Sequence, residues 1–231
     1  MNKTKNLIIV GDSSFAEVAY EYFQFDSDYN VVAFSVESAY LKKTSLMQLP
    51  VVPLENLPQL FNPEDYYVYV AVVYSQLNQL RTRLYQKIKQ LNYKLASYIS
   101  KHAFIWKNVE IGEHCFIFEN NVIQPFVKIG ANNVLWSGNH IGHHSNIGNN
   151  CFISSHVVIS GHCQINDNCF FGVNSTLADR VTIAEDCVIG AGATLFKNTE
   201  PGLIYKSKHT EIASISSYQL FKIKPLETAH E

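Results

Sequence analysis

Histidine is the residue type in this chain whose number and spacing could support chemistry. Five histidines lie between residues 140 and 162, namely His140, His143, His144, His156 and His162. A neutral imidazole can take a proton from an attacking amine or hydroxyl, because its unperturbed pKa lies close to neutrality. Three imidazoles that converge could instead hold a zinc ion. Which of these two chemistries is available depends on the elements that carry the side chains.

The histidines lie within a six-residue repeat. Every sixth residue from Ile99 to Leu195 is large and apolar, which gives 17 positions without an insertion. The position two residues earlier holds mostly small side chains from Val109 onward. A period of six is neither the 3.6 of a helix nor the alternation of an isolated strand. It predicts short parallel strands separated by corners, with three strands and 18 residues in each coil of a β-helix.

The repeat predicts structural roles for the cysteines and asparagines. All five cysteines fall in the column of small residues, their number is odd, and no two form a CxxC pair. They are therefore predicted to be small apolar core residues rather than disulfides or zinc ligands. Asn132, Asn150 and Asn168 are one coil apart and should form a hydrogen-bonded ladder, which His114 continues at one end.

The repeat also separates the histidines. Ile141 points inward, so that His143 and His144 lie in the following corner and point outward. Gly161 lies one coil from His143 and leaves space beside it, whereas His144 is expected to stack on His162. His143 is therefore the first candidate for a catalytic base and His144 the second. A metal site around this corner is the weaker alternative, and no metal is expected.

Residues 1–96 lack the period of six. Strands are expected at residues 7–10 and 31–36 and within the apolar run 67–74, alternating with helices, one of them over residues 77–91. This order predicts a small parallel α/β sheet. Ligands of such sheets bind beyond the carboxyl ends of the strands. The predicted ligand-binding residues are therefore Gly11, Asp12, Ser13, Ser14, Phe34, Ser35 and Tyr74.

The first of these turns, GDSSFA at residues 11–16, has two interpretations. It lacks the second glycine of the dinucleotide-binding fingerprint, and a side chain of Asp12, Ser13 or Ser14 could simply cap the following helix. The free N–H groups at the same helix start could also bind a phosphate.

A small α/β domain followed directly by a hexapeptide β-helix resembles the bacterial nucleotide-sugar acetyltransferases. That family includes N-acetyltransferases of amino sugars and sialic acid O-acetyltransferase-like proteins. The resemblance divides the chain into a nucleotide-sugar-binding domain (residues 1–96), a left-handed β-helix (97–198) and a C-terminal tail (199–231). It implies an acetyl-CoA-dependent sugar N-acetyltransferase of surface glycan biosynthesis (lipopolysaccharide or O-antigen), assembled as a homotrimer. The left-handed sense of the β-helix is implied by the resemblance alone, because parallel crossovers are in general right-handed.

The resemblance extends to the motifs of the nucleotide-binding, catalytic and acetyl-CoA-binding sites. The family's nucleotide-binding turn reads Gly-x-Ser-Gly-His/Phe-Gly/Ala, and here Ser14 stands in place of the middle glycine, while Glu37 matches the acidic residue that often follows the second strand. The segment that carries the base in relatives reads His-(Asp/Glu)-x-x-Ile-Gly. Residues 143–148 match it as HHSNIG, which makes His143 the implied base and puts His144 in place of the acidic neighbour. The positions implied to contact acetyl-CoA, in a groove between adjacent prisms, are Phe152, Gly161, Val173 and Ala191, with Lys197 available to a CoA phosphate.

The composition limits the classes of partner that can be expected. A formal net charge of −2 and 16% charged residues give no electrostatic reason to expect nucleic acid or an acidic membrane. No apolar run approaches the ~18 residues of a membrane span, and the N-terminus lacks the pattern of a signal peptide, so a cytoplasmic protein is expected.

Three other functions stay open. A sugar O-acetyltransferase would use the same base. A non-catalytic β-helix subunit would only bind or scaffold. A zinc enzyme like the γ-carbonic anhydrases would need three histidines that converge between subunits.

Overall fold

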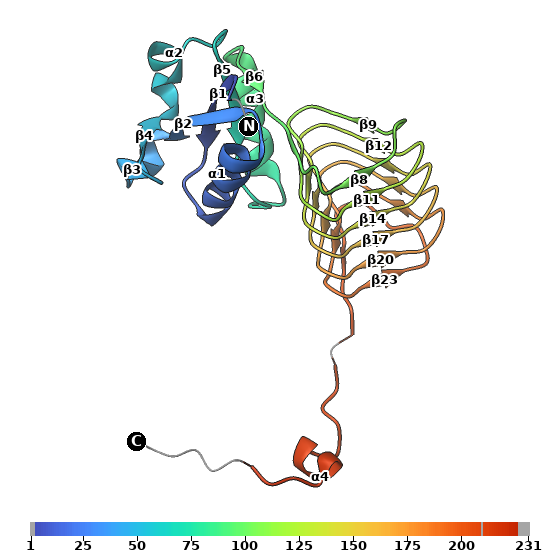
Figure 1. The fold of residues 1–231 in the computed structure, drawn as a ribbon. Coiled ribbons are helices and arrows are strands. Elements are labelled where there is room, and N and C mark those ends of the chain that lie inside the picture. Colours follow the sequence, from blue (N-terminus) through green and yellow to red (C-terminus); the bar gives the residue numbers. More distant parts are fainter. Residues whose placement is uncertain (1–2, 209, 226–231) are drawn as a thin grey trace.

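The computed structural model describes residues 3–208 and 210–225. Figure 1 shows a front domain beside a stack of coils, and a C-terminal tail that leaves the last coil. The predicted tail, residues 199–231, lies partly outside the described residues. No helix within the described part of the chain is long and apolar enough to cross a membrane.

The front domain is the predicted small α/β sheet. Its elements are β1 (Lys5–Val10), α1 (Ser14–Asp26), β2 (Tyr29–Val36), β3 (Ser45–Leu46), β4 (Leu49–Pro53), α2 (Leu57–Leu60), β5 (Tyr66–Val70), α3 (Gln79–Gln90) and β6 (Lys94–Leu95), with 3-10 turns at Ser38–Tyr40 and Leu54–Asn56. The strands lie in the order β3-β4-β2-β1-β5-β6, and all neighbours are parallel except β3 and β4. The last four residues of β1 are buried, because helices and the β-helix cover both faces of the sheet.

The second domain is a left-handed parallel β-helix, in the register that the repeat predicts. Seventeen two-residue strands recur every six residues between Tyr98 and Leu195, and they form three faces. The first face contains β7 (Tyr98–Ile99), β10 (Phe116–Ile117), β13 (Val134–Leu135), β16 (Phe152–Ile153), β19 (Phe170–Phe171), β22 (Val188–Ile189) and the additional strand β24 (Ile204–Tyr205). The second contains β8 (Phe104–Ile105), β11 (Val122–Ile123), β14 (His140–Ile141), β17 (Val158–Ile159), β20 (Thr176–Leu177) and β23 (Thr194–Leu195). The third contains β9 (Glu110–Ile111), β12 (Lys128–Ile129), β15 (Asn146–Ile147), β18 (Gln164–Ile165) and β21 (Thr182–Ile183), and the tail adds the short helix α4 (Ser217–Phe221).

The corners between the faces form three edges along the β-helix. The histidine edge joins the second and third faces (residues 106–109, 124–127, 142–145, 160–163 and 178–181). The asparagine edge joins the third and first faces (112–115, 130–133, 148–151, 166–169 and 184–187). The tryptophan edge joins the first and second faces (118–121, 136–139, 154–157, 172–175 and 190–193).

Each corner turns through one residue in the left-handed region. Positive φ recurs at every sixth residue from His114 to Gly192. Asparagine, aspartate and glycine adopt this conformation most easily, which explains why asparagine is frequent at these corners.

The asparagine edge holds the predicted ladder. Hydrogen bonds of 2.9 and 3.1 Å join the side chains of Asn132, Asn150 and Asn168. His114 Nδ1 lies 2.9 Å from Asn132 Oδ1, and Asn168 donates to Asp186 Oδ1 at 3.0 Å. The role predicted for the cysteines is also confirmed, because all five are buried and free.

The first face is aromatic and covered by the front domain. Phe116 lies with its ring centroid 5.8 Å from Phe15 and 5.6 Å from Phe23 of α1, and 5.4 Å from Tyr69 of β5. These rings belong to one buried cluster that crosses from the front domain to the β-helix. Burial of so much aromatic surface packs the two domains as one unit.

Arg81 of α3 joins the two domains at the asparagine edge. Its side chain is fully buried, and burial lowers the pKa of its guanidinium to about 10, so it stays charged at neutral pH. Its Nη1 donates to Val73 O and Asn78 Oδ1, both at 3.0 Å. Its Nη2 donates to the backbone oxygens of Asn150 (2.9 Å) and Cys151 (3.1 Å).

Replacing Arg81 by leucine is expected to lower the free energy of unfolding by about 3–5 kcal/mol, because several buried oxygens lose their donors at once. Arg83→Leu on the same helix is the matched control. The Arg83 side chain is 52% exposed in its ion pair, so a change below about 1 kcal/mol is expected. Urea unfolding followed by tryptophan fluorescence measures both, and equal losses would contradict the role given to Arg81.

His114 makes the fold sensitive to acid. Its buried Nε2 accepts a hydrogen bond from the Val70 N–H (2.8 Å), which places the ring proton on Nδ1, toward Asn132. Burial lowers the pKa of His114 to about 3, from an ordinary value of 6.5. Because the folded pKa lies below the unfolded one, the stability contributed by the neutral ring is complete above pH 6.5 and is lost as the pH falls from 6.5 toward about 3.

We expect His114→Asn to be less stable than the wild type at neutral pH, because the Val70 N–H loses its acceptor. Asparagine tolerates the left-handed corner and has no proton to gain, so the variant should lose less stability on acidification. Urea midpoints at about pH 7, 5.5 and 4 test this difference. Parallel curves would mean that other groups set the acid sensitivity.

Candidate functional site

A pocket of about 510 Å³ opens at the carboxyl ends of β1, β2 and β5, where a parallel sheet is expected to bind its ligand. Among the predicted residues, Gly11, Asp12 and Ser13 line this pocket, and Ser14 is the first residue of α1. Phe34 and Ser35 are fully buried within β2 and do not line it. Strand β2 continues to residue 36, so the pocket reaches residues 36 and 37 instead.

The turn after β1 depends on Gly11. Its φ is +129°, and a Cβ at this position would lie 2.7 Å from Ala71 O, so a side chain does not fit. The Gly11 N–H donates to Ser35 O (2.8 Å), which ties the turn to β2. Within the described part of the chain no side chain caps α1, so the capping interpretation of this turn is wrong. The first N–H groups of α1 are therefore left for another partner, such as an anion.

Glu37 lies at the rim of the pocket and is held by Arg83 of α3. Its two carboxylate oxygens accept hydrogen bonds from Nη1 (2.7 Å) and Nη2 (2.8 Å) of Arg83, and Lys87 Nζ lies 3.6 Å away. The bonds with Arg83 lower the pKa of Glu37. No sequence motif marks Arg83, because the pair joins residues 46 positions apart.

Three consecutive residues with positive φ precede α3, and the first of them, Gln76, lines the pocket. Gln76, Leu77 and Asn78 have φ angles of 53°, 48° and 67°, a conformation that is costly for residues other than glycine. The buried Asn78 amide donates to Asn168 O (3.1 Å) and Cys169 O (3.3 Å) on the asparagine edge. The β-helix therefore helps to shape the pocket of the front domain.

A separate, smaller cleft of about 370 Å³ lies between the residues that follow β5 and the tryptophan edge. Val73 lines both cavities. Tyr74, predicted at the ligand pocket, lies in this cleft instead, with its ring 5.0 Å from Phe152 and 4.6 Å from Phe170. Trp136 lines the far side of the cleft.

His143 lies exposed on the histidine edge. Its backbone N–H donates to Gln124 Oε1 (2.9 Å), and its Nδ1 lies 3.1 Å from His144 Nδ1. His144 stacks on His162 as predicted, with ring centroids 4.8 Å apart and planes inclined by 15°. A proton on His143 Nδ1, accepted by His144, leaves the lone pair of His143 Nε2 free to act as a base.

The histidine edge places bulky residues in the left-handed conformation. Phe126, His144, His162 and Arg180 occupy its successive corners, with φ between 56° and 65°. A bulky side chain in this conformation costs about 1–2 kcal/mol. Phe126 also stacks on His144, at a centroid distance of 4.6 Å. Strained residues of this kind gather at functional sites.

His143, His144 and His162 also form the cluster of imidazoles that could hold a metal ion. Ring nitrogens of His143, His144 and His162 lie within 4.8 Å of one another. Tetrahedral zinc, with Zn–N of about 2.0–2.1 Å, needs its nitrogens roughly 3.4 Å apart. The parallel stacking of His144 on His162 does not turn their nitrogens toward a common point. The arrangement therefore suits proton transfer better than a closed zinc site.

The residues implied to contact acetyl-CoA lie on different edges of the β-helix. Gly161 lies on the histidine edge, and Lys197 is exposed in the turn after β23. Val173 and Ala191 are exposed on the tryptophan edge, whereas Phe152 is buried on the first face. One chain therefore does not bring these five residues into a single groove.

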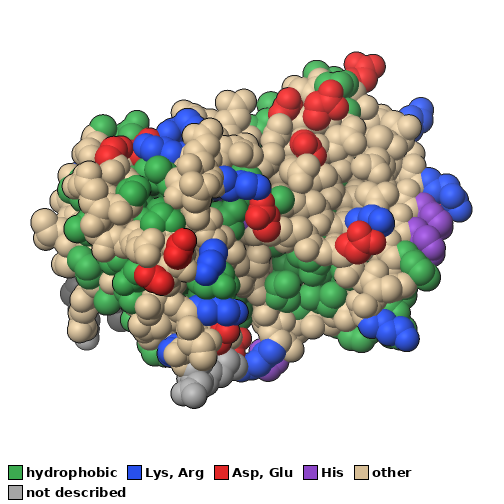
Figure 2. Space-filling model, turned by 90° about the horizontal axis from the view of Figure 1, so that it is seen from above, with side chains coloured by type: hydrophobic (Ala, Val, Ile, Leu, Met, Phe, Trp, Pro, Cys, Tyr) green, Lys and Arg blue, Asp and Glu red, His purple; other side chains and the backbone are tan. Residues whose placement is uncertain are grey.

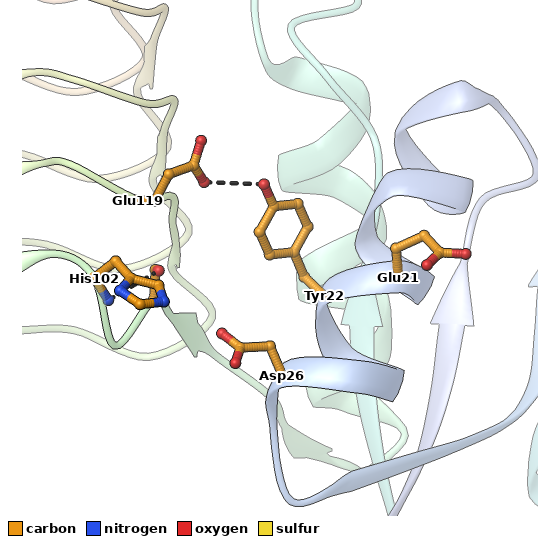
Figure 3. Close-up of a pocket in the computed structure, with 6 residues that line it drawn as sticks. Glu21, Tyr22, Asp26, His102 and Glu119 are labelled. Carbon is orange, nitrogen blue, oxygen red and sulfur yellow. Dashed lines mark hydrogen bonds between the residues drawn. The ribbon is translucent and has the colours of Figure 1, made fainter.

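The cleft in Figure 3 lies where α1 meets the tryptophan edge, and several carboxylates line it. Tyr22 donates to Glu119 (2.9 Å), and burial together with this bond raises the pKa of Tyr22 to about 12. Asp26 accepts hydrogen bonds from Tyr98 (2.7 Å) and Lys101. These bonds run from α1 to the β-helix, so the cleft is part of the domain contact.

The ligand pocket and His143 lie on different sides of the β-helix. The front domain covers the first face, whereas the histidine edge joins the other two faces. Figure 2 shows histidine side chains at the end of the molecule far from the front domain. A ligand in the pocket is therefore out of reach of His143 in the same chain.

Comparisons with known proteins agree with this architecture. Residues 108–143, 126–161, 144–179 and 162–197 each match the family described as bacterial transferase hexapeptide (six repeats). A search of curated protein sequences gives no match.

Solved structures match over both domains. PerB from Caulobacter crescentus, solved with CoA and GDP-perosamine, is 21% identical at a TM-score of 0.79, with 87% of this chain and 94% of that chain covered. The acetyltransferase domain of PglB from Neisseria gonorrhoeae is 18% identical at a TM-score of 0.79, with 88% and 97% covered. WeeI from Acinetobacter baumannii is 20% identical at a TM-score of 0.56, with 87% and 96% covered. Residues 108–197 thus carry the hexapeptide repeat described for bacterial transferases, and the two-domain fold is similar to that of PerB and of the PglB acetyltransferase domain.

Proposed function

We propose that the protein is an acetyl-CoA-dependent N-acetyltransferase that acts on a nucleotide-linked amino sugar in surface glycan biosynthesis, with His143 as the general base. One observation carries this proposal: an exposed imidazole has its Nδ1 held by His144 and its Nε2 beside Gly161, which has no side chain to cover it. PerB, which shares the fold, binds CoA and GDP-perosamine, and this supports the two substrate classes.

The proposed reaction is a direct transfer. The sugar amine attacks the thioester carbonyl while His143 Nε2 takes a proton from the amine. The C–N bond forms and the C–S bond breaks. The proton then passes from His143 to the CoA sulfur, so the products are the amide and the free CoA thiol. A backbone N–H could stabilise the oxyanion of the intermediate.

The complete site is proposed to form between two copies of the chain. A ligand in the pocket of one copy needs His143 from another, because the two lie on different sides of the β-helix. The second face offers apolar surface for this contact, since Phe104, Val122 and Val158 are 53%, 36% and 38% exposed. Repetition of one such contact around an axis closes the expected homotrimer.

This assembly would unite the residues implied to contact acetyl-CoA. Gly161 and Lys197 would come from one copy, and the next copy would add Phe152 from its first face and Val173 and Ala191 from its tryptophan edge. The nucleotide would occupy the pocket at the start of α1, where backbone N–H groups favour phosphate. The cleft at Tyr74 would direct the sugar toward the contact between the two copies, where the partner's histidine edge lies.

A thiol-release assay tests the proposal. Acetyl-CoA is offered with a panel of UDP-, GDP- and dTDP-linked 3-amino and 4-amino sugars, and turnover with one of them is expected. Matched sugars that carry a hydroxyl in place of the amine test O-acetylation. Binding of the nucleotide sugar without any turnover would favour a non-catalytic protein.

The proposed transfer needs no metal, so turnover is expected to survive treatment with EDTA and removal of the chelator. Metal analysis of the purified protein accompanies the assay. Stoichiometric zinc, or activity that is lost with the metal and restored by zinc, would favour a zinc enzyme instead.

A further inference from the structure

His143 has a histidine, not a carboxylate, as its neighbour in the chain. A base that takes a proton from an amine becomes an imidazolium, and a nearby carboxylate stabilises that charge. Among the corner residues of the histidine edge, all of which the structure describes, Asp179 is the one carboxylate. It occupies the corner position of His143 two coils further along.

Gly161 lies between these two residues and opens the space that they share. A Cβ at residue 161 would lie 2.9 Å from His143 Cε1, and 3.0 Å from both His143 Nε2 and Asp179 Oδ1. The imidazole and the carboxylate therefore border the same small space. The backbone of Gly161 does not lie in the left-handed region, so the corner itself does not require glycine here. A side chain at residue 161 would occupy the space between His143 and Asp179 and keep the two apart.

We propose that Asp179 is the positioning residue of His143 and acts across Gly161 in place of the missing acidic neighbour. The inference rests on the proposed function for its catalytic meaning. His144 holds the Nδ1 side of the ring, and Asp179 lies on the Nε2 side, where the proton from the amine arrives. Asp179 Oδ2 pairs with Arg180 Nε (3.3 Å), and both side chains are more than half exposed, so Oδ1 is left to face the shared space.

The other groups that face His143 make this carboxylate important. Gln124 is neutral, whereas His144, His162 and Arg180 are positive or become so on protonation. Partial desolvation, Arg180 and the two other imidazoles lower the pKa of His162, and Asp179 opposes that change. Asp179 is thus the negative charge that opposes the positive neighbours within this cluster.

The first test is an NMR titration of protein labelled at histidine Cε1, with the His143 signal assigned by its loss in His143→Gln. In Asp179→Asn the midpoint of the His143 titration is expected to fall by up to about one pH unit, because the imidazolium loses its counter-charge. Asp179→Glu should restore most of the shift. Glu185→Gln, which removes an exposed carboxylate on the asparagine edge, is the matched control and should leave the midpoint unchanged.

The second test is kinetic. Asp179→Asn is expected to lower kcat about tenfold with little change in KM for acetyl-CoA, and to move the acid limb of the pH–rate profile to lower pH. An unchanged midpoint for His143 in Asp179→Asn would overturn the proposal, whatever the activity. If Asp179→Asn shifts the His143 midpoint but the wild-type protein acetylates no acceptor, the pairing of Asp179 with His143 stands and the proposed function is refuted instead.

Discussion

Replacing His143 by alanine is expected to reduce kcat about 10²- to 10⁴-fold, the usual contribution of a general base. The KM for acetyl-CoA should change little, because the imidazole acts on the proton of the acceptor and not on the pantetheine arm. The thiol-release assay under saturating substrate measures the effect. His144→Ala should cost less, since His144 orients the ring through a single contact of 3.1 Å.

His102→Ala is the control for this variant. His102 is also an exposed corner histidine, but it lines the cleft against α1 and lies far from the histidine edge. Its loss should leave kcat unchanged. Undiminished activity in His143→Ala, with the fold and the trimer intact, would remove His143 as the base and make His144 the next candidate.

Mixing two inactive variants is expected to restore activity. One variant lacks the base (His143→Ala), and the other carries Ser13→Trp, which fills the exposed mouth of the ligand pocket without altering the core. If each site combines the pocket of one copy with His143 of the next, a mixed trimer contains sites in which both parts are intact. Each mixed trimer has one intact site in three, so the purified mixed trimers should regain about a third of the wild-type activity.

The mixed trimers are obtained by co-expression of the two variants with different tags, followed by two affinity steps. Each variant alone, and a mixture of separately assembled trimers, are the controls. Activity that stays at the level of these controls would mean that the pocket and His143 serve one another within a single chain, which contradicts the position of His143 across the β-helix.

The β-helix could be predicted closely because a fixed separation along the sequence corresponds to a contact in space. Parallel strands in register bring every residue into contact with the residue 18 positions away. The ladder through Asn132 and the stack of His144 on His162 therefore follow from counting along the chain. The buried cysteines follow from the column of small residues in the same way.

The front domain could be predicted less closely, because a single strand has no repeat to fix its ends. The end of β2 at residue 36 was predicted, but Phe34 and Ser35 lie before that end and are buried, so their assignment to the ligand site was wrong and the pocket begins beyond them. Strand β5 ends at residue 70, before the end of its apolar run, and Tyr74 turns to the β-helix instead of the pocket. The predicted alternation of β1, α1, β2, β5 and α3 is nevertheless confirmed, whereas β3, β4, α2 and β6 were not predicted.

The sequence by itself determined the period, the inward and outward faces of the β-helix and the exposure of His143. Only the tertiary structure decided how Arg81 and Asn78 anchor the front domain, how Arg83 holds Glu37, and on which side of the β-helix the pocket lies. These contacts join residues that no repeat relates. They depend on how two separately patterned domains pack, and that packing is set by the shapes of their side chains rather than by spacing along the chain.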